Sequence, residues 1–347
     1  MTALANIVMA DDGISFDGNS LQRGPLGGAE TAFASLATSL AKRGNNVSVI
    51  NNCPRPMKKD GVNWAPIRNG IPERCDLFIA NRSDKLLPLA AQARTVIFWI
   101  HNPAKYLLKF RYLSKIWRRK PIIIFSGSYH AKSYPKWAPD GGRKIIPYGI
   151  SDDFGNVHQQ NAAPKPVAIF TSNPLRGLSW LLDLWTEHIS TKMPDAELHI
   201  YSGALTYGEL GSSQKDRMQL VLDKALELSS NNVHLHNPVP KKRLVEVLKQ
   251  SRVLLYRGDP GETFCLAVGE AQAAGVPAVV QDIGCVAERV IDGKTGFVAK
   301  DDVEFADAAL KLLKNDNLWL QNHVEALNVQ GSWGWNEAAA EFERLIK

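Results

Sequence analysis

Cysteine is scarce in this sequence and follows no regular spacing. The chain of 347 residues has 4 cysteines, and none belongs to a C-x-x-C pair. A disulfide framework or a cysteine-rich zinc site would need a denser pattern. We therefore expect reduced thiols at Cys53, Cys75, Cys265 and Cys285, as in a cytoplasmic protein.

Long hydrophobic runs are also missing. The most apolar stretches, residues 95–100 and 121–125, have the length of buried strands and not of a membrane span. The first ten residues lack the basic region and apolar core of a signal peptide. We found no internal repeat, and we expect a cytoplasmic protein.

Charge of either sign is only slightly unbalanced. Lys and Arg number 41 against 35 Asp and Glu, a net charge of +6. This mild excess favours anionic partners, and we expect no nucleic-acid partner. With 45% hydrophobic and 22% charged residues the chain is typical of a globular protein, and its length favours two domains.

The stretch of residues 258–280 has the most informative pattern. A Gly/Pro turn follows the predicted strand 252–256, a helix begins near Phe264 and ends at Gly275, and residues 278–280 form the next strand. The helix therefore begins at the carboxyl end of a buried strand. Its first N–H groups, at Phe264, Cys265 and Leu266, are expected to bind phosphate.

Two glutamates flank the start of this helix. Glu262 and Glu270 are eight residues apart, which corresponds to about 12 Å if the segment is helical. That span suits a nucleotide sugar, with one carboxylate for the sugar and one for the ribose. The alternative is an ordinary βαβ unit with two solvated glutamates. If the spacing of the two glutamates were the only observation, this alternative would be favoured.

The block of Glu262, seven residues, Glu270 and then Ala-Gln-Ala-Ala-Gly-Val-Pro resembles the signature of retaining glycosyltransferases of family 4, the group 1 glycosyltransferases. The resemblance is close at residues 258–298 and looser elsewhere. It implies an α/β protein with two doubly wound Rossmann-like domains facing across a cleft, the GT-B fold. It also implies transfer of a hexose from a UDP-, GDP- or ADP-sugar to a hydroxyl acceptor, with Thr263 to Leu266 and Glu270 binding the donor.

No metal or other cofactor is expected under this resemblance, since the sequence has no Asp-x-Asp motif. The leaving phosphate would be stabilised by helix N–H groups and Arg176, and would deprotonate the incoming hydroxyl. Glu262 would orient the sugar. Glycosidases place two carboxylates at the anomeric carbon, and the spacing of Glu262 and Glu270 does not favour that arrangement.

The N-terminal part begins as a βαβ unit. A strand at residues 6–10 leads through the turn 24–28 into a helix from about Ala29 to Arg43. The turn is not a G-x-G-x-x-G fingerprint, which disfavours a nicotinamide-dependent dehydrogenase. Gly27 and Gly28 resemble a family loop that approaches the donor phosphates. The alternative is a flexible turn that needs positive φ.

His101 directly follows the predicted strand 95–100, so it is expected to project into a ligand crevice. The resemblance places it beside the transferred sugar, as a catalytic residue with Glu262 and Arg176. The alternative is a structural hydrogen-bonding histidine.

Arg176 and Gly177 follow the predicted strand 167–171, where the family carries a Lys-Gly pair. Ser172 occupies the place of a family arginine and is itself a candidate donor-binding residue, although one phosphate-binding cation is missing. Arg176 is expected to bind the diphosphate, since a guanidinium can chelate phosphate oxygens.

The segment 105–120 combines seven basic residues and four aromatic ones with no acidic residue. A basic helix with Trp and Leu can lie in a layer of anionic headgroups. The resemblance implies that the acceptor is a sugar or a lipid-linked sugar, as in cell-envelope glycan synthesis, and such a helix would place the protein peripherally on the inner face of the membrane. The alternative is a helix packed on its own sheet with solvated charges.

The predicted domains are residues 1–155 on the acceptor side, residues 156–330 for the nucleotide sugar, and residues 331–347 as a helix that returns to the first domain. Two other functions stay open: a sugar-nucleotide epimerase of the same fold, and a nucleotide-sugar-binding protein without activity.

Overall fold

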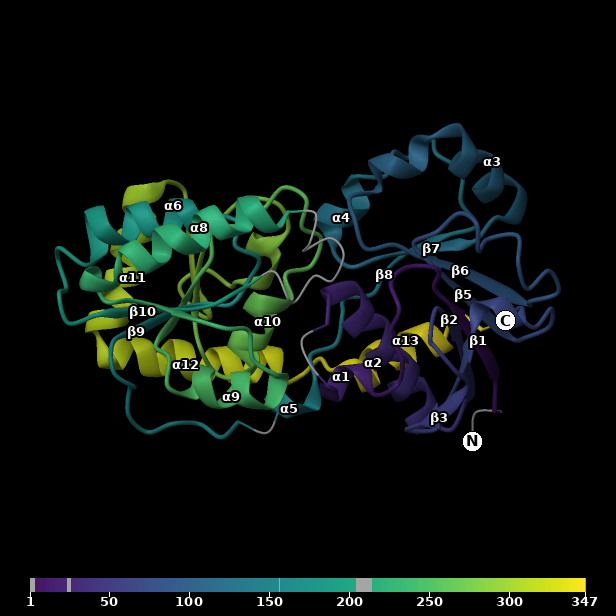
Figure 1. Cartoon of the computed structure of the whole chain (residues 1–347), viewed down its shortest axis with the longest axis horizontal. Coiled ribbons are helices and arrows are strands. Elements are labelled where there is room, and N and C mark those ends of the chain that lie inside the picture. The colour runs from purple at the N-terminus through teal and green to yellow at the C-terminus, as the bar shows by residue number, and fades with distance from the viewer. Residues whose placement is uncertain (1–3, 24–25, 156, 204–213, 347) are drawn as a thin grey trace. The chain divides into compact units, whose positions relative to one another are not determined.

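Two separate sheets organise the chain. The computed structural model describes residues 4–23, 26–155, 157–203 and 214–346. They form two compact units, the first comprising the residues up to Gly149 together with those from Gly334, and the second running from Ile150 to Trp333 (Figure 1). Both are α/β, as predicted.

The first unit contains an eight-stranded sheet of order β3-β4-β2-β1-β5-β6-β7-β8. All pairs are parallel except β3 with β4. Strands β5 and β6 are buried at every position, as expected for a parallel sheet covered on both faces. The strands are β1 (Asn6–Ala10), β2 (Asn46–Asn51), β3 (Met57–Lys59), β4 (Val62–Pro66), β5 (Leu77–Asn81), β6 (Thr95–Trp99), β7 (Ile122–Phe125) and β8 (Arg143–Ile145).

The last helix of the chain belongs to this first unit. Helix α13 (Trp335–Glu343) runs beside α2 (Gly28–Lys42) (Figure 1). Arg43 forms an ion pair of 2.8 Å with Glu343, and the Phe342 ring packs edge-on against Trp99 at 5.3 Å. The other helical segments of the unit are α1 (Ser20–Arg23), η1 (Ile67–Asn69), η2 (Ala104–Leu108), α3 (Phe110–Arg119) and α4 (Ser128–Lys132).

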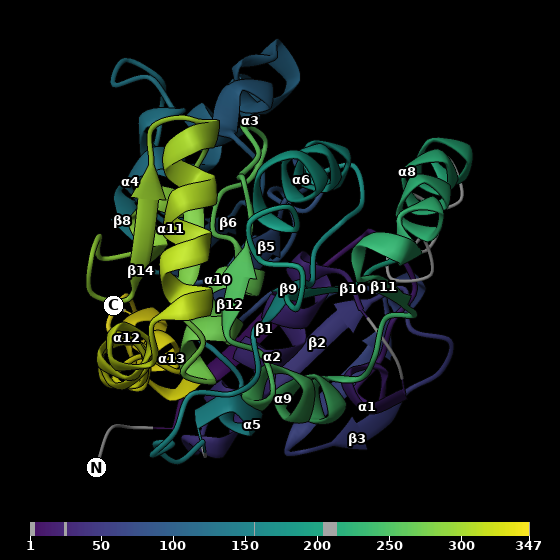
Figure 2. The same cartoon turned by 90° about the vertical axis from the view of Figure 1, so that its left-hand side faces the viewer.

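The second unit contains a six-stranded sheet of order β11-β10-β9-β12-β13-β14, with parallel pairing throughout (Figure 2). Its strands are β9 (Val167–Phe170), β10 (Glu197–Tyr201), β11 (Val233–His236), β12 (Val253–Leu255), β13 (Ala278–Gln281) and β14 (Gly296–Ala299). Its helical segments are α5 (Asp152–Gly155), α6 (Leu178–Leu184), η3 (Trp185–Ile189), α8 (Lys215–Glu227), η5 (Ser229–Asn231), α9 (Lys241–Lys249), α10 (Leu266–Ala273), η6 (Val286–Arg289), α11 (Asp302–Lys314) and α12 (Asp316–Gln330).

Each sheet reverses its strand order at one point. In the first unit β1 lies between β2 and β5, and in the second β9 lies between β10 and β12. The loops that leave two such neighbouring strands diverge to opposite faces of the sheet. Ligands of open parallel sheets bind at these switch points, outside the carboxyl ends of the strands.

The predicted domain boundary at residue 155 lies slightly late. Ile150 already packs in the second unit, where a Cβ added to Gly269 would lie 2.8 Å from the Ile150 Cδ1 atom. Phe154, on α5, is fully buried. The change of unit therefore falls between Gly149 and Ile150.

Helix α10 begins at Leu266 and not near Phe264 as predicted. Cys265 adopts a left-handed conformation with φ of 64°, which a helical residue cannot have. The estimate of about 12 Å between the Glu262 and Glu270 backbones assumed a continuous helix. It therefore does not apply to this loop.

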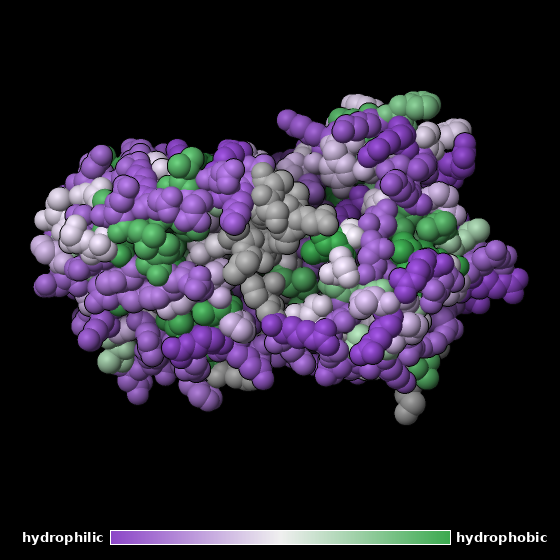
Figure 3. Space-filling view, in the orientation of Figure 1, coloured by the Kyte–Doolittle hydropathy of each residue, from purple (hydrophilic) through white to green (hydrophobic). Residues whose placement is uncertain are grey.

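The basic segment 105–120 is not one helix. The turn η2 ends at Leu108, Lys109 is extended, and α3 follows. Tyr112 and Ile116 of α3 are buried, whereas Phe110 and Trp117 are 85% and 69% exposed. Hydrophobic and hydrophilic side chains lie side by side on the surface over α3 (Figure 3).

Among the described residues, no helix has both the length and the apolar character needed to cross a membrane. The four cysteines, which we expected to be reduced, are free and buried.

Candidate functional site

Arg176 and Glu262 meet at the switch point of the second unit. Arg176 lies in the loop after β9, and Glu262 lies in the loop between β12 and α10. The Arg176 Nη1 atom is 2.7 Å from the Glu262 Oε1 atom. Tyr256, directly after β12, donates its hydroxyl to the other carboxylate oxygen at 2.7 Å. The carboxylate is thus held from two sides.

Burial dominates the electrostatics of Glu262. Glu262 is 7% exposed, and this burial raises the pKa of its carboxyl group. The charge of Arg176 and hydrogen bonds from Tyr256 and Cys265 act in the opposite direction and lower that pKa. Burial likewise raises the pKa of the Tyr256 hydroxyl, which therefore remains a donor. The arrangement offers a fixed carboxylate beside a guanidinium whose side chain is 38% exposed.

The segment between Glu262 and α10 is mostly buried. Thr263, Phe264 and Cys265 are buried, and Leu266 is half-buried. The guanidinium of Arg289 lies 4.4 Å from the centre of the Phe264 ring. Leu266 begins the first turn of α10, where backbone N–H groups have no acceptor within the helix. The predicted phosphate-binding amides thus lie beside Glu262 in the chain, but in a turn and the start of a helix.

Glu270 lies on the second turn of α10 and pairs with Lys241. It is 5% exposed, and its Oε1 atom is 2.5 Å from the Lys241 ammonium nitrogen. Lys241 is the first residue of α9, where a positive charge opposes the helix dipole. The pairing offsets this cost. It also places a cation at the carboxylate that we predicted to bind ribose.

Ser172 and Arg257 lie near the Arg176 loop. The Ser172 carbonyl accepts a hydrogen bond of 2.5 Å from the Ser202 hydroxyl. A Cβ added to Gly177 would lie 3.3 Å from the Arg257 Cβ atom, so Arg257 stands beside the Arg176–Gly177 turn. Arg257 stacks on Trp180 at 4.9 Å. The structure thus places a second arginine close to the turn that contains Ser172, the residue expected at the position of a family arginine.

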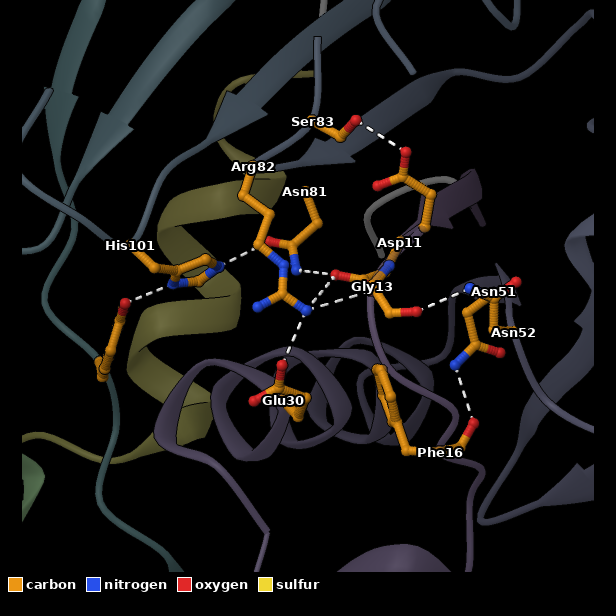
Figure 4. A network of polar contacts seen from close by, with 12 residues as sticks. Asp11, Gly13, Phe16, Glu30, Asn51, Asn52, Asn81, Arg82, Ser83 and His101 are labelled. Atoms are coloured by element: carbon orange, nitrogen blue, oxygen red, sulfur yellow. Dashed lines mark hydrogen bonds and ion pairs between the residues drawn. The ribbon is translucent and has the colours of Figure 1, made fainter. Parts of the chain in front are cut away.

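A buried polar network occupies the switch point of the first unit (Figure 4). Asp11, directly after β1, is fully buried. Asn81, at the end of β5, donates its amide to Asp11 Oδ2 at 2.5 Å, and Arg82 approaches the same oxygen at 3.1 Å. Arg82 also binds Glu30 of α2 at 2.7 Å. One arginine therefore compensates two carboxylates.

His101 extends this network, and its tautomer follows from its partners. Because the Asp11 carboxylate can only accept, the Asn81 amide nitrogen points to it and the Asn81 oxygen points to His101. The Nε2 atom of His101 lies 2.5 Å from that oxygen and therefore carries the proton. Nδ1 then accepts from the Tyr148 hydroxyl.

The His101 imidazole is neutral. Burial, together with the charges of Arg82 and His130, holds its pKa well below the usual range. Burial also lowers the pKa of His130, to about 4. His101 belongs to the first unit, whereas Arg176, Glu262 and Glu270 belong to the second.

Gly27 and Gly28 mark the start of α2. Gly27 caps the helix with φ of −57°, so it is not there for a positive φ. A Cβ on Gly27 would lie 2.4 Å from a carboxylate oxygen of Glu30, so the glycine leaves room for that side chain. Two residues of the predicted turn, 24 and 25, lie outside the described residues.

Comparison with known proteins assigns part of the chain to a family. The model of a family described as glycosyl transferases group 1 matches residues 165–315. The chain carries a group 1 glycosyltransferase domain in a GT-B fold. This domain contains the Arg176–Glu262 pair and Glu270.

Curated relatives match the chain over part of its length. It is similar to a D-inositol 3-phosphate glycosyltransferase of Corynebacterium diphtheriae, with 28% identity over 44% of this chain and 35% of the relative. It is also similar to a phosphatidyl-myo-inositol mannosyltransferase of Mycobacterium leprae, with 31% identity over 25% of this chain and 24% of the relative. The matches thus span about a third or less of the first relatives.

Solved structures extend the likeness to nearly the whole chain, as regards the fold. A sucrose-phosphate synthase from Thermosynechococcus elongatus gives a TM-score of 0.75 at 14% identity, over 98% of both chains. HepE of Anabaena, in complex with UDP-glucose, gives a TM-score of 0.70 at 16% identity, over 98% of this chain and 99% of the other.

Several residues of these two clusters were not predicted from the sequence. They are Asp11, Glu30, Asn81, Arg82 and Tyr148 in the first unit, and Tyr256 and Lys241 in the glycosyltransferase domain. A signal existed for Asp11, Asn81 and Arg82, because each lies at or just past the end of a buried strand. Lys241 pairs with Glu270, and Glu30 pairs with Arg82, through tertiary contacts that no local sequence pattern indicates.

The neutral state of His101 predicts a pH dependence. Since the folded pKa lies below the unfolded value near 6.5, the unfolded chain binds more protons as the pH falls. His101 thus contributes stability above about pH 6.5, and this is lost on acidification by up to about 1.4 kcal/mol per pH unit. His130 adds a similar loss down to about pH 4.

We expect His101→Gln to be less stable than the wild type but to lose less stability between pH 6.5 and 5, as measured by urea unfolding. His188→Gln, which removes a more exposed histidine of the other unit, is the control. An unchanged slope in His101→Gln would show that the buried imidazole does not stay neutral.

Proposed function

We propose that this protein is a retaining hexosyltransferase, which moves a hexose from a nucleotide diphosphate sugar to a hydroxyl acceptor. The observation that carries this proposal is the Arg176–Glu262–Tyr256 cluster at the switch point of a group 1 glycosyltransferase domain. A cation and an oriented carboxylate are what a site for a diphosphate and a sugar requires.

Arg176 and the first amides of α10 would receive the leaving diphosphate. Negative charge develops on the bridging oxygen as the glycosidic bond breaks, and preorganised donors stabilise it. Arg176 comes from the loop after β9 and α10 follows the neighbouring β12, so both approach from the carboxyl edge. The phosphate in turn accepts the proton of the acceptor hydroxyl on the same face, and this gives retention.

Glu262 would orient the sugar and not attack it. Both of its oxygens already accept hydrogen bonds, from Arg176 and from Tyr256. A carboxylate held in this way accepts further hydrogen bonds from hydroxyls through its remaining lone pairs. His101 is proposed as a neutral hydrogen-bonding group beside the sugar, with Gly27 and Gly28 near the phosphates.

The donor to test first is a UDP-sugar. HepE, which shares the fold, was solved with UDP-glucose. The D-inositol 3-phosphate glycosyltransferases and the mannosyltransferase among the relatives also favour transfer to a hydroxyl acceptor. Conversion of the donor sugar without any glycosidic product would indicate the epimerase, and binding without turnover would indicate an inactive binding protein.

Substitutions of Glu270 and Glu262 are expected to affect different steps, donor binding and turnover respectively. Glu270→Ala should weaken donor binding by about 1.5–3 kcal/mol, more than tenfold in Kd, because it removes charge-assisted hydrogen bonds to the ribose. Glu262→Gln keeps the contacts of an amide but removes the charge, so it should lower kcat more than donor affinity. Calorimetry with UDP and transfer assays measure the two effects.

Glu246→Ala, on the exposed side of α9, is the matched control and should leave both quantities unchanged. In the same assays His101→Gln should reduce transfer while UDP still binds. Normal donor affinity in Glu270→Ala together with normal turnover in Glu262→Gln would contradict the proposed roles.

Arg176 is expected to supply most of the cationic contact to the diphosphate. Arg176→Lys should keep part of the affinity for UDP, since it retains a charge but loses the planar fork, and Arg176→Ala should lose more. Arg217→Ala removes an exposed arginine of α8 that donates a hydrogen bond to Gln214, and it serves as the control. Equal UDP affinity in the wild type and Arg176→Ala would rule out this role.

For the acceptor we propose a lipid-linked sugar reached by docking on an anionic surface through α3. Phe110 and Trp117 are seven residues apart and thus lie on one face of the helix, exposed. Arg111 and Arg118 follow each of them on the adjoining face. An aromatic and basic stripe of this kind fits the headgroup layer of an anionic membrane.

The charge available for docking is smaller than the sequence suggested. Asp84, from outside the segment, pairs with Lys115 at 2.6 Å and lies 3.7 Å from Arg111. Arg119 donates to backbone carbonyls of residues 90 and 91. One face of α3 packs on its own unit, as the structural alternative predicted, and docking through the exposed face stays a proposal.

Sedimentation with vesicles tests the docking proposal. Arg118→Gln with Lys120→Gln should weaken binding to anionic vesicles at low salt by roughly 2 kcal/mol, more than tenfold, at about 1 kcal/mol per basic residue. Trp117→Ala should also weaken it. Trp137→Ala, which removes another exposed tryptophan, should not. Absence of wild-type binding to anionic vesicles at low salt would favour a soluble acceptor.

A further inference from the structure

We propose that Glu197, His199 and His234 form a binding site for a divalent transition metal ion, best suited to Zn²⁺, on the sheet of the second unit. Each residue offers one ligand atom, and these atoms all lie within 4.8 Å of one another. One carboxylate and two imidazoles, with a position left for water, make a donor set typical of zinc sites.

The sheet itself brings these side chains together. Along β10, Leu198 and Ile200 are buried on one face, so Glu197 and His199 project from the other. His199 is paired in register with His234 on β11, the edge strand (Figure 2). Neighbouring residues of parallel strands point to the same face. The cluster thus follows from backbone pairing and not from a mobile loop.

The two distances from the Glu197 carboxylate bracket the spacing expected in a tetrahedral site. Glu197 Oε2 lies 2.8 Å from His199 Nε2 and 3.8 Å from His234 Nε2. Two ligands bound at about 2.0–2.1 Å from one tetrahedral ion are roughly 3.4 Å apart. The two observed separations lie on either side of this value. All three ligand atoms lie within 4.8 Å of one another, so binding the ion would draw them together by rotation of the side chains.

His236 supplies the supporting contact that metal-binding histidines usually have. Its Nε2 atom lies 3.1 Å from His199 Nδ1. With Nε2 of His199 on the metal, Nδ1 carries the proton and donates it to His236, which fixes the ring. Tyr201, paired in register with His236, stacks on that ring at 4.5 Å. His236 is a positioning residue in this arrangement.

The ligands are accessible from solvent. The exposed fractions of the side chains are 41% for Glu197, 24% for His199 and 42% for His234. Lys165 lies within electrostatic range of Glu197, so the ion must compete with one nearby positive charge. An ion shared by β10 and β11 would clamp the edge strand to the sheet. None of the residues proposed to bind the donor takes part, so binding can be tested without the transfer reaction.

The test is titration of the full chain, free of affinity tag and treated with a chelator, with Zn²⁺ alone. Calorimetry at pH 7.5 should show one ion per chain, and Zn²⁺ should raise the melting temperature because it binds the folded state. His199→Ala and His234→Ala should each lose this binding. His188→Ala removes a histidine that also neighbours a glutamate, at 3.8 Å, and should bind as the wild type does.

A second readout separates ligation from folding. Co²⁺ should give the visible absorption of a tetrahedral site in the wild type and in His188→Ala, and none in His234→Ala, whose circular dichroism shows whether it is folded. His236→Ala should still bind Zn²⁺, but about 10–100-fold more weakly. Absence of Zn²⁺ binding to the wild type would overturn the proposal, as would binding that His199→Ala and His234→Ala leave unchanged.

Discussion

A buried carboxylate must be paired, and this requirement shapes the switch point of each sheet. Asp11 after β1 is fully buried and Glu262 after β12 is 7% exposed. Each is compensated by an arginine that follows the neighbouring strand. Arg82, after β5, pairs with Asp11, and Arg176, in the loop after β9, pairs with Glu262. Leaving such a charge unpaired costs several kcal/mol, so each pair ties together two loops that the strand order sends apart.

These ties explain why the loops are held in the observed conformations. Arg82 has a φ of 50° and Cys265 a φ of 64°, both unusual for residues with a side chain. Cys265 lies next to Glu262 in space and donates a hydrogen bond to it. Such strained residues persist where the surrounding contacts determine the backbone, and they concentrate at binding sites. The strain and the buried charge are thus parts of one arrangement in each unit.

The fold, and the strand–turn–helix segment that carries the candidate site, could be predicted from the sequence, whereas the pairing of its side chains could not. The Gly/Pro turn, the two glutamates and the Gly-Val-Pro end mark a strand–turn–helix–strand unit through local rules for strands and helix ends. The start of α10 at Leu266, however, depends on the left-handed conformation of Cys265. Such a conformation is usually indicated by a glycine, and the sequence has none at this position. Lys241 pairs with Glu270, 29 positions away, and Asp84 pairs with Lys115, 31 positions away. Local sequence rules do not reach over such separations.

The Arg176–Glu262 ion pair also changes how the two residues must be understood. The sequence suggested separate tasks, with Glu262 for the sugar and Arg176 for the diphosphate. In the structure each is the other's partner at 2.7 Å, and Glu262 has a pKa raised by burial and lowered again by the Arg176 charge. Residues in direct contact show interaction energies of about 0.5–3 kcal/mol, so the effects of changing them do not add. Under the proposed function, a donor diphosphate that draws the guanidinium toward itself would weaken its hold on Glu262, and this would make the carboxylate a stronger acceptor for sugar hydroxyls. Phosphate binding and sugar orientation would then be coupled through one ion pair, so that a substitution of either residue would affect both steps, though to different degrees.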